Sequence, residues 1–250
     1  MSIKQIHFLC ALPRTGSTFL SSIVNQSKQI QITANSIVPN LLYNIILHKE
    51  FTTFKNFPYH EGIDNVAFNV FNNYYSNVKQ KNILDKSCWG TPFNLTIIKN
   101  IFEKRKFVVL VRPVLESLAS MVKAKKISNE SNEEFCKTLM DKNTGKIGKE
   151  IWSIKNLIKE NEKYHLIHYD DLVKNTQEEI DKMFDFLEIE REKFKLQNIK
   201  QFQFEGISYN DDVLSGDFHT IRENEIKKIN YNIEDFLSKE IIDQYKDIKI

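Results

Sequence analysis

The feature that most constrains the fold lies at residues 6–20, IHFLCALPRTGSTFL. An apolar run ends in a tight turn that contains Pro13 and Gly16, and a segment able to begin a helix follows it. A strand that leads through a glycine turn into a helix N-terminus gathers several backbone N–H groups and the positive end of the helix dipole at one point. The segment therefore predicts an anion-binding loop.

This loop matches the phosphate-binding pattern G-x-x-x-x-G-K-[ST] only in part. Ala11 and Gly16 occupy the two glycine positions, and Thr18 occupies the Ser/Thr position. Ser17 replaces the lysine that a kinase or NTPase directs at the β- and γ-phosphates, and the basic residue is Arg14 instead. We interpret the loop as a phosphate or sulfate site of another kind. A capped strand-to-helix turn without a ligand is the alternative.

Short apolar runs rich in β-branched residues alternate with helical patterns along the chain. The candidate strands are 4–12, 82–86, 106–112 and 164–169, and the candidate helices are 18–26, 92–104, 114–126, 147–162 and 175–188. Near-continuous apolar strands are typical of a buried parallel sheet. The alternation predicts an α/β fold: a three-layer α/β/α arrangement with a mostly parallel central sheet, of the P-loop nucleotide-fold type.

Two regions, 37–80 and 200–222, do not follow this alternation. A chain of 250 residues suits one domain, so we expect a single domain over 1–250 with a helical insertion at 37–80. Its aromatic stretch 51–75 could line a ligand pocket, since aromatic walls are common there. We expect most of these aromatic side chains to be core instead.

Charge and cysteine content disfavour several classes of protein. Lys and Arg total 35 against 33 Asp and Glu, and a net charge of +2 argues against general nucleic-acid binding. Cys10, Cys88 and Cys136 are an odd number without C-x-x-C spacing, which disfavours a disulfide framework or a zinc site. The chain shows no charged-then-apolar leader and no apolar run of about 18 residues. We therefore expect a cytoplasmic protein without a membrane span.

A second candidate anion site begins where the apolar run 107–111 ends. Arg112 follows this run, and an arginine at the carboxyl end of a buried strand points into the crevice where α/β proteins bind ligands. Ser120 lies about two helical turns further along, so that both side chains could reach one phosphate. The alternative is that Arg112 pairs with an acidic residue at the start of the following helix.

Taken in order, these motifs resemble those of the sulfotransferases that use 3′-phosphoadenosine-5′-phosphosulfate (PAPS). The matching segments are PRTGSTFL at 13–20, RPVLESLAS at 112–120 and the Tyr-Asp-Asp-Leu segment at 169–172. The segment DFHTIR at 217–222 is similar to the H-T-I-R loop of a bacterial and phage branch. Each motif alone is weak, but four in order with matching spacing, over residues 5–222, are a strong signal.

The resemblance implies how the donor is bound. The first loop would bind the 5′-phosphosulfate, Phe19 would stack on the adenine, and Arg112 with Ser120 would hold the 3′-phosphate. The cofactor-binding residues so implied are Arg14, Thr15, Gly16, Ser17, Thr18, Phe19, Arg112, Ser120, Tyr169 and Arg222. The product would be 3′-phosphoadenosine-5′-phosphate (PAP).

The chemistry of sulfuryl transfer agrees with these residue types. Negative charge grows on the leaving phosphate, so fixed cations and backbone donors are most useful there. Arg14 is one candidate for this task. Lys86 is the other, in a segment, 83–87, that resembles the strand and lysine between the two phosphate motifs of the family. A sulfuryl group carries less charge than a phosphoryl group, so we expect no metal.

The general base does not carry over from the family. Cytosolic members carry Lys-Thr-His where this chain has Lys-Ser-Cys at 86–88, and the tyrosylprotein branch carries a Glu where this chain has Asn35. The remaining candidates for the base are His48, His60, Glu61 and His219. We select His219 as the third catalytic residue, beside Arg14 and Lys86.

These observations predict a sulfotransferase that moves a sulfuryl group from PAPS to a hydroxyl or amine of a small-molecule, glycan or lipid acceptor, with 37–80 on the acceptor side. Two alternatives remain open. One is a nucleotide-binding P-loop protein without transfer activity, because the bases of the family are absent. The other is an ATP-dependent P-loop kinase, against which Ser17 argues.

Overall fold

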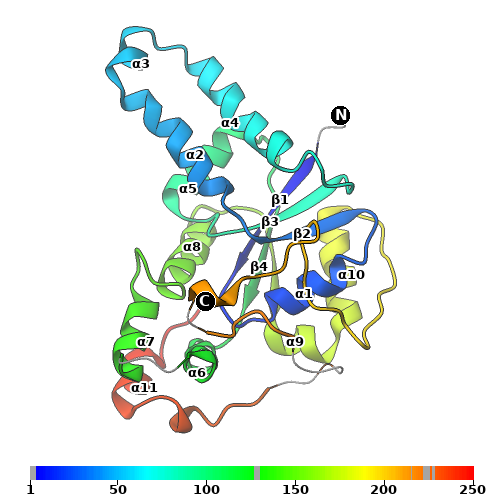
Figure 1. Cartoon of the computed structure of the whole chain (residues 1–250), viewed down its shortest axis with the longest axis vertical. Coiled ribbons are helices and arrows are strands. Elements are labelled where there is room, and N and C mark those ends of the chain that lie inside the picture. The colour runs from blue at the N-terminus through cyan, green and yellow to red at the C-terminus, as the bar shows by residue number, and fades with distance from the viewer. Residues whose placement is uncertain (1–3, 127–129, 215, 222–225, 227–228) are drawn as a thin grey trace.

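The protein is described by a computed structural model covering residues 4–126, 130–214, 216–221, 226 and 229–250 (Figure 1). Five strands form one sheet: β1 (Gln5–Ala11), β2 (Ile30–Asn35), β3 (Asn82–Lys86), β4 (Phe107–Val111) and β5 (Tyr164–His168). Their order across the sheet is β2-β3-β1-β4-β5, and every neighbouring pair is parallel. The predicted α/β fold with a parallel sheet is confirmed.

Apolar side chains cover both faces of the sheet. Along β1, Phe8 and Cys10 belong to one hydrophobic cluster while Leu9 and Ala11 belong to the other, because successive residues of a strand point to opposite faces. This two-sided burial explains the near-continuous apolar runs in the sequence.

Helices pack on each face and complete the three layers (Figure 1). The face of Leu9 is covered by α1 (Ser17–Val24), α9 (Tyr169–Lys174) and α10 (Thr176–Leu187). The face of Phe8 is covered by α5 (Pro92–Ile101), α6 (Val114–Ala124), α7 (Asn132–Met140) and α8 (Gly148–Lys159), with α11 (Lys239–Tyr245) against α6. Among the described residues, no helix is both long enough and apolar enough to cross a membrane.

The sequence pattern did not reveal β2. This strand lies at the edge of the sheet, and Gln31 and Thr33 alternate with its isoleucines, so it lacks the continuous apolar run of the central strands. Both polar side chains are nevertheless buried. The Thr33 hydroxyl accepts a hydrogen bond from the Lys86 backbone N–H at 2.9 Å, which ties β2 to the end of β3.

A helical hairpin projects from the sheet between β2 and β3 (Figure 1). It consists of α2 (Val38–Leu47), a 3-10 turn (His48–Glu50), α3 (Thr52–Asn56) and α4 (His60–Tyr74). The expectation that most of its aromatic side chains are core is wrong. Phe71 and Tyr75 are buried at the base of the hairpin, but four are exposed: Phe51, Phe57, Tyr59 and Tyr74. Only the base of the hairpin packs against the sheet, so aromatic side chains further out find no surface to cover them.

A buried carboxylate fastens both ends of the hairpin to β3. Asp85 is fully buried and accepts hydrogen bonds from the Tyr75 hydroxyl, from Ser36 Oγ at 2.9 Å and from Trp89 Nε1 at 3.0 Å. Burial raises the pKa of Asp85 to about 6, and the three donors oppose that rise. Because Asp85 immediately precedes Lys86, the network also fixes the end of the strand that carries this lysine.

We expect Tyr75→Phe to lower the free energy of unfolding by about 1–3 kcal/mol, because the buried Asp85 carboxyl loses one of its donors. Urea denaturation measures the effect. Tyr74→Phe is the control, because Tyr74 is 46% exposed, and it should change stability by less than about 0.5 kcal/mol. Equal stability of the two variants would contradict the role given to this network.

Candidate functional site

The carboxyl ends of the parallel strands bring the sequence motifs to one edge of the sheet. The loop 12–16 follows β1, Lys86 ends β3, Arg112 follows β4 and Tyr169 follows β5. This edge is where open α/β sheets bind their ligands. A cavity of about 640 Å³ lies there and is lined by residues from all four segments.

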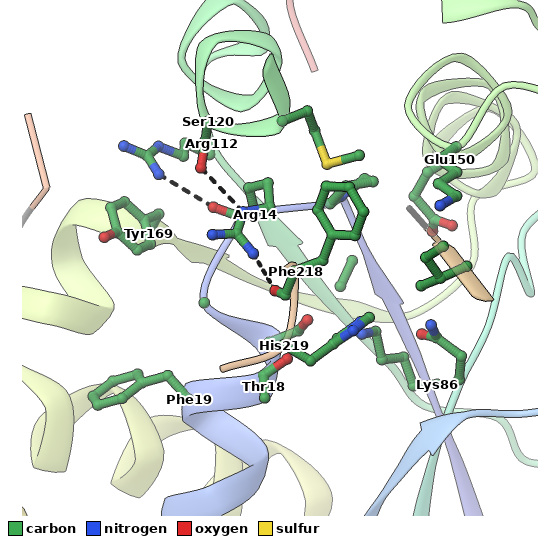
Figure 2. A pocket seen from close by; sticks show the side chains of 18 of the residues that line it. Arg14, Thr18, Phe19, Lys86, Arg112, Ser120, Glu150, Tyr169, Phe218 and His219 are labelled. Carbon is green, nitrogen blue, oxygen red and sulfur yellow. Dashed lines mark hydrogen bonds between the residues drawn. The ribbon is translucent and has the colours of Figure 1, made fainter. Parts of the chain in front are cut away.

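Most of the predicted site residues line this cavity (Figure 2). They are Arg14, Gly16, Ser17, Thr18, Phe19, Lys86, Arg112, Ser120, Tyr169 and His219. Thr15 does not line it: the residue is fully buried, and its hydroxyl donates a hydrogen bond to the Leu12 carbonyl at 2.7 Å. Arg222 lies outside the described residues.

The other candidate bases lie elsewhere. His48, His60 and Glu61 belong to the hairpin, and no residue of 37–80 lines the cavity. The hairpin meets the site only at its base, where Asn35 at the end of β2 is a lining residue.

The loop that begins α1 depends on left-handed backbone. Arg14 has φ 64° and Gly16 has φ 78°, and such residues turn successive N–H groups toward one side. Gly16 is also pressed against another element, because a Cβ at this position would lie 3.3 Å from a ring carbon of Tyr169. The glycine is therefore required both by the turn and by its close approach to α9.

The two arginine motifs meet in one cluster (Figure 2). Arg14 Nε donates to Ser120 Oγ at 3.0 Å, and Arg112 Nη1 donates to the Arg14 carbonyl at 3.2 Å. The predicted loop and the predicted Arg112–Ser120 pair are thus in direct contact, although 106 positions separate Arg14 from Ser120 in the chain.

Arg112 is held from several directions. Its residue is only 4% exposed, and its guanidinium forms an ion pair with Glu116 at 2.9 Å, which is the pairing that the alternative reading of the sequence expected. The guanidinium carbon lies 4.1 Å from the ring centre of Tyr169 and 5.2 Å from that of Tyr231. Because Glu116 binds through one oxygen, the ion pair leaves other guanidinium N–H groups for further acceptors.

Residues between 218 and 231 supply hydrogen-bond partners to the arginine cluster. Arg112 Nη2 donates to the Ile229 carbonyl at 3.0 Å, and Arg14 Nη1 donates to the Phe218 carbonyl. The Tyr231 hydroxyl donates to Ser120 Oγ at 3.0 Å. The cluster therefore presents its donors to oxygen acceptors in an arrangement that an anion can also use.

Lys86 and Glu150, a carboxylate that the sequence analysis missed, both lie on the other side of the cavity from Arg112 (Figure 2). Burial lowers the pKa of Lys86 to about 8, and Glu150 and Cys88 oppose the change. Burial raises the pKa of Glu150 to about 8, opposed by the Cys88 thiol, by Lys86 and Lys149 and by the Ala11 backbone. The pKa values of Lys86 and Glu150 are thus shifted toward each other.

The sequence contained one signal for Glu150. Residues Ile147, Ile151 and Ile154 form a buried stripe on α8 and its N-cap, and Glu150 lies on the same stripe. A carboxylate at a helical core position has to be explained by a partner or a ligand, because burying it alone is costly.

His219 is fixed by two residues from the irregular tract. Its ring stacks on Tyr209 with centroids 3.7 Å apart and planes 4° apart. Its Nδ1 lies 2.5 Å from Asp211 Oδ1, and Asp211 Oδ2 accepts the backbone N–H groups of Phe218 and His219. A carboxylate only accepts, so Nδ1 carries the hydrogen and Nε2 is the basic atom.

Burial and charge set the protonation of this pair. Burial lowers the pKa of His219, Asp211 opposes the shift, and Lys86 and Arg14 add to it. Burial alone would raise the pKa of Asp211, but hydrogen bonds from His219 and from the Phe218 backbone lower it. His219 is therefore neutral and Asp211 ionised near pH 7. Tyr209 and Asp211 had no motif in the sequence to indicate them.

The described residues place no group of three or more His, Cys, Asp and Glu side chains where a metal ion could be held.

Comparisons with known proteins identify the family. The sulfotransferase domain family matches residues 5–247. No curated protein matches the chain. Three solved structures share the fold: the sulfotransferase domain from the curacin biosynthetic pathway (18% identity, TM-score 0.52, 100% of this chain and 92% of that chain), the sulfotransferase domain from the Synechococcus PCC 7002 olefin synthase (14%, 0.52, 100% and 90%), and a mouse sulfotransferase complexed with PAP (12%, 0.55, 98% and 84%).

The family match spans nearly the whole chain and confirms the family predicted from the motifs, whereas membership of a bacterial and phage branch stays a prediction. At these identities the solved structures show the fold alone. The chain belongs to the sulfotransferase family, enzymes that transfer a sulfuryl group from PAPS to small-molecule acceptors.

Proposed function

We propose that this sulfotransferase transfers the sulfuryl group of PAPS to a hydroxyl or amine of its small-molecule acceptor, with the donor and the acceptor in the two halves of one cavity. One observation carries the proposal: a single cavity brings together the Arg14–Arg112–Ser120 cluster with Lys86 and His219. We also propose one domain over 1–250, in which 37–80 is an insertion whose base adjoins the acceptor half at Asn35.

The nucleotide half contains the arginine cluster. Arg112 and Ser120 bind the 3′-phosphate: its oxygens replace the Ile229 carbonyl as the acceptor of Arg112, and the Ser120 hydroxyl donates to them. Arg14 and the N–H groups at the start of α1 bind the 5′-phosphosulfate. Phe19 and Tyr169, which line the same half, flank the adenine.

The transfer step breaks one bond and forms another. The acceptor oxygen or nitrogen attacks the sulfur, the bond from sulfur to the 5′-phosphate oxygen breaks, and PAP leaves with the electron pair. Arg14 and Lys86 stabilise the charge that grows on the leaving phosphate. His219 Nε2 accepts the proton of the acceptor, and Asp211 positions the imidazole.

We expect Arg112→Ala to weaken the binding of PAP by about 1.5–3 kcal/mol, or about 10- to 150-fold, because a charge-assisted contact to the 3′-phosphate is lost. Binding of 5′-AMP should change far less, because this nucleotide lacks the 3′-phosphate. Calorimetry with both nucleotides gives the two dissociation constants.

Arg191→Ala is the matched control, because Arg191 is an exposed arginine paired with Asp185 away from the cavity. It should leave both dissociation constants unchanged. Equal affinity of the wild-type protein for PAP and 5′-AMP would reject Arg112 and Ser120 as the 3′-phosphate site.

We expect the transfer rate to rise with pH and to level off at the pKa of His219, below the ordinary value of 6.5, because the base acts only when neutral. Asp211 raises this pKa, so Asp211→Asn should move the acidic limb to lower pH and reduce the rate. His219→Asn should abolish the limb. Transfer of radiolabelled sulfate to a panel of sugars, phenols and lipids measures the rate.

His60→Asn changes a histidine of the hairpin and serves as the control, with an unaltered profile expected. A His219→Asn variant that keeps the rate and the acidic limb of the wild type would exclude His219 as the base.

A further inference from the structure

We infer that Glu150 binds a second hydrogen-bond donor of the acceptor, so that the acceptor carries a hydroxyl or amino group in addition to the one that is sulfated. This inference rests on the proposed function, because it places Glu150 in the half of the cavity where the acceptor is proposed to bind. The substrate class is a diol or an amino alcohol, of which saccharides are one kind.

The Glu150 carboxyl faces the cavity with one oxygen unpaired. The residue is 4% exposed and lines the cavity wall. Its Oε1 is buried and has no hydrogen-bond partner among the described residues. A buried carboxyl oxygen without a donor is costly, and native structures leave few such atoms unsatisfied. A donor from a bound ligand removes that cost.

The protein itself holds the carboxyl in place without satisfying Oε1. The Cys88 thiol donates to the other oxygen, Oε2, at 2.7 Å, which fixes the orientation of the group. Lys86, Lys149 and the Ala11 backbone lower the pKa of the carboxyl, but within the described part of the chain none of them donates a hydrogen bond to Oε1. Oε1 is therefore available to a ligand in the cavity.

The position of Glu150 favours a group other than the reacting one. In Figure 2, His219 and Thr18 are drawn below the arginine cluster, at the start of α1, where the sulfuryl group is proposed to lie, and Glu150 is drawn apart from them on α8. The hydrogen bond from His219 Nδ1 to Asp211 leaves Nε2 as the basic nitrogen, so His219 suits the role of accepting the proton of the reacting hydroxyl. An acceptor that reaches His219 with one group can reach Glu150 only with another.

An acceptor with one hydroxyl would leave Oε1 unpaired after binding. A site built around a hydrogen bond discriminates strongly against an analogue that lacks the matching group, because the polar atom of the protein then stays buried without a partner. Glu150 therefore acts as a specificity-determining residue for acceptors with two donors.

The test compares three probes of the same skeleton: cyclohexanol, trans-1,2-cyclohexanediol and trans-2-aminocyclohexanol. Each is titrated into the wild-type protein saturated with PAP, and binding is followed by ligand-observed NMR. We expect both two-donor probes to bind at least about tenfold more tightly than cyclohexanol. Equal binding of the three probes, or no measurable binding of either two-donor probe, overturns the inference.

Two variants assign this preference to Glu150. Glu150→Met removes both oxygens at similar volume, and replacing a buried polar group by an apolar one is compatible with folding. In this variant the two-donor probes should bind about as tightly as cyclohexanol, while PAP binding is unchanged. Glu150→Gln keeps an amide oxygen and should retain part of the preference. Glu160→Gln, on an exposed carboxylate at the end of α8, is the control and should behave as the wild type.

A merely structural role would give a different pattern. Binding of all three probes and of PAP would then weaken together in Glu150→Met, with their ratio preserved, and this result overturns the inference. Failure of the proposed function is recognised separately, because the wild-type protein would then not prefer PAP to 5′-AMP. If that preference holds and the probe ratio does not depend on Glu150, only the present inference fails.

Discussion

The buried guanidinium of Arg112 is the interaction on which the site depends. It joins the end of β4 to the carbonyl of Arg14 in the first loop, to Glu116 on α6 and to the ring of Tyr169 on α9. Elements from both faces of the sheet are therefore fixed relative to one another by a single cation. A lysine could not replace it, because only the planar guanidinium offers several donors in fixed directions together with a face that stacks on an aromatic ring.

The two halves of the cavity differ in their electrostatics. The nucleotide half contains arginines, whose planar guanidinium groups suit the binding of phosphate groups. The other half contains Lys86 and Glu150, whose pKa values burial shifts toward each other to about 8, and a histidine whose pKa is lowered. Groups with such shifted pKa values are suited to proton transfer and to selective hydrogen bonding near neutral pH. The division matches a reaction in which one substrate is an anion and the other is a neutral or weakly charged acceptor.

The sheet and the first loop were predictable because their signals are local. Buried parallel strands are nearly all apolar, and the turn at Gly16 needs a residue that tolerates left-handed backbone against Tyr169. Their common carboxyl edge then determines that Lys86, Arg112 and Tyr169 meet.

Other parts of the site depend on contacts between distant segments. Asp211 and Tyr209 come from a tract without periodicity and acquire a role only by packing against His219. Glu150 lines the cavity because α8 packs against β1. The exposure of the hairpin aromatics follows from how far the hairpin projects. A local sequence pattern encodes neither of these arrangements.

The most direct test of the account is a crystal structure of the protein with PAP. The account predicts that the 3′-phosphate replaces the Ile229 carbonyl as the acceptor of Arg112 and accepts the Ser120 hydroxyl, while Arg14 contacts the 5′-phosphate. A complex in which either guanidinium points away from the nucleotide would contradict it.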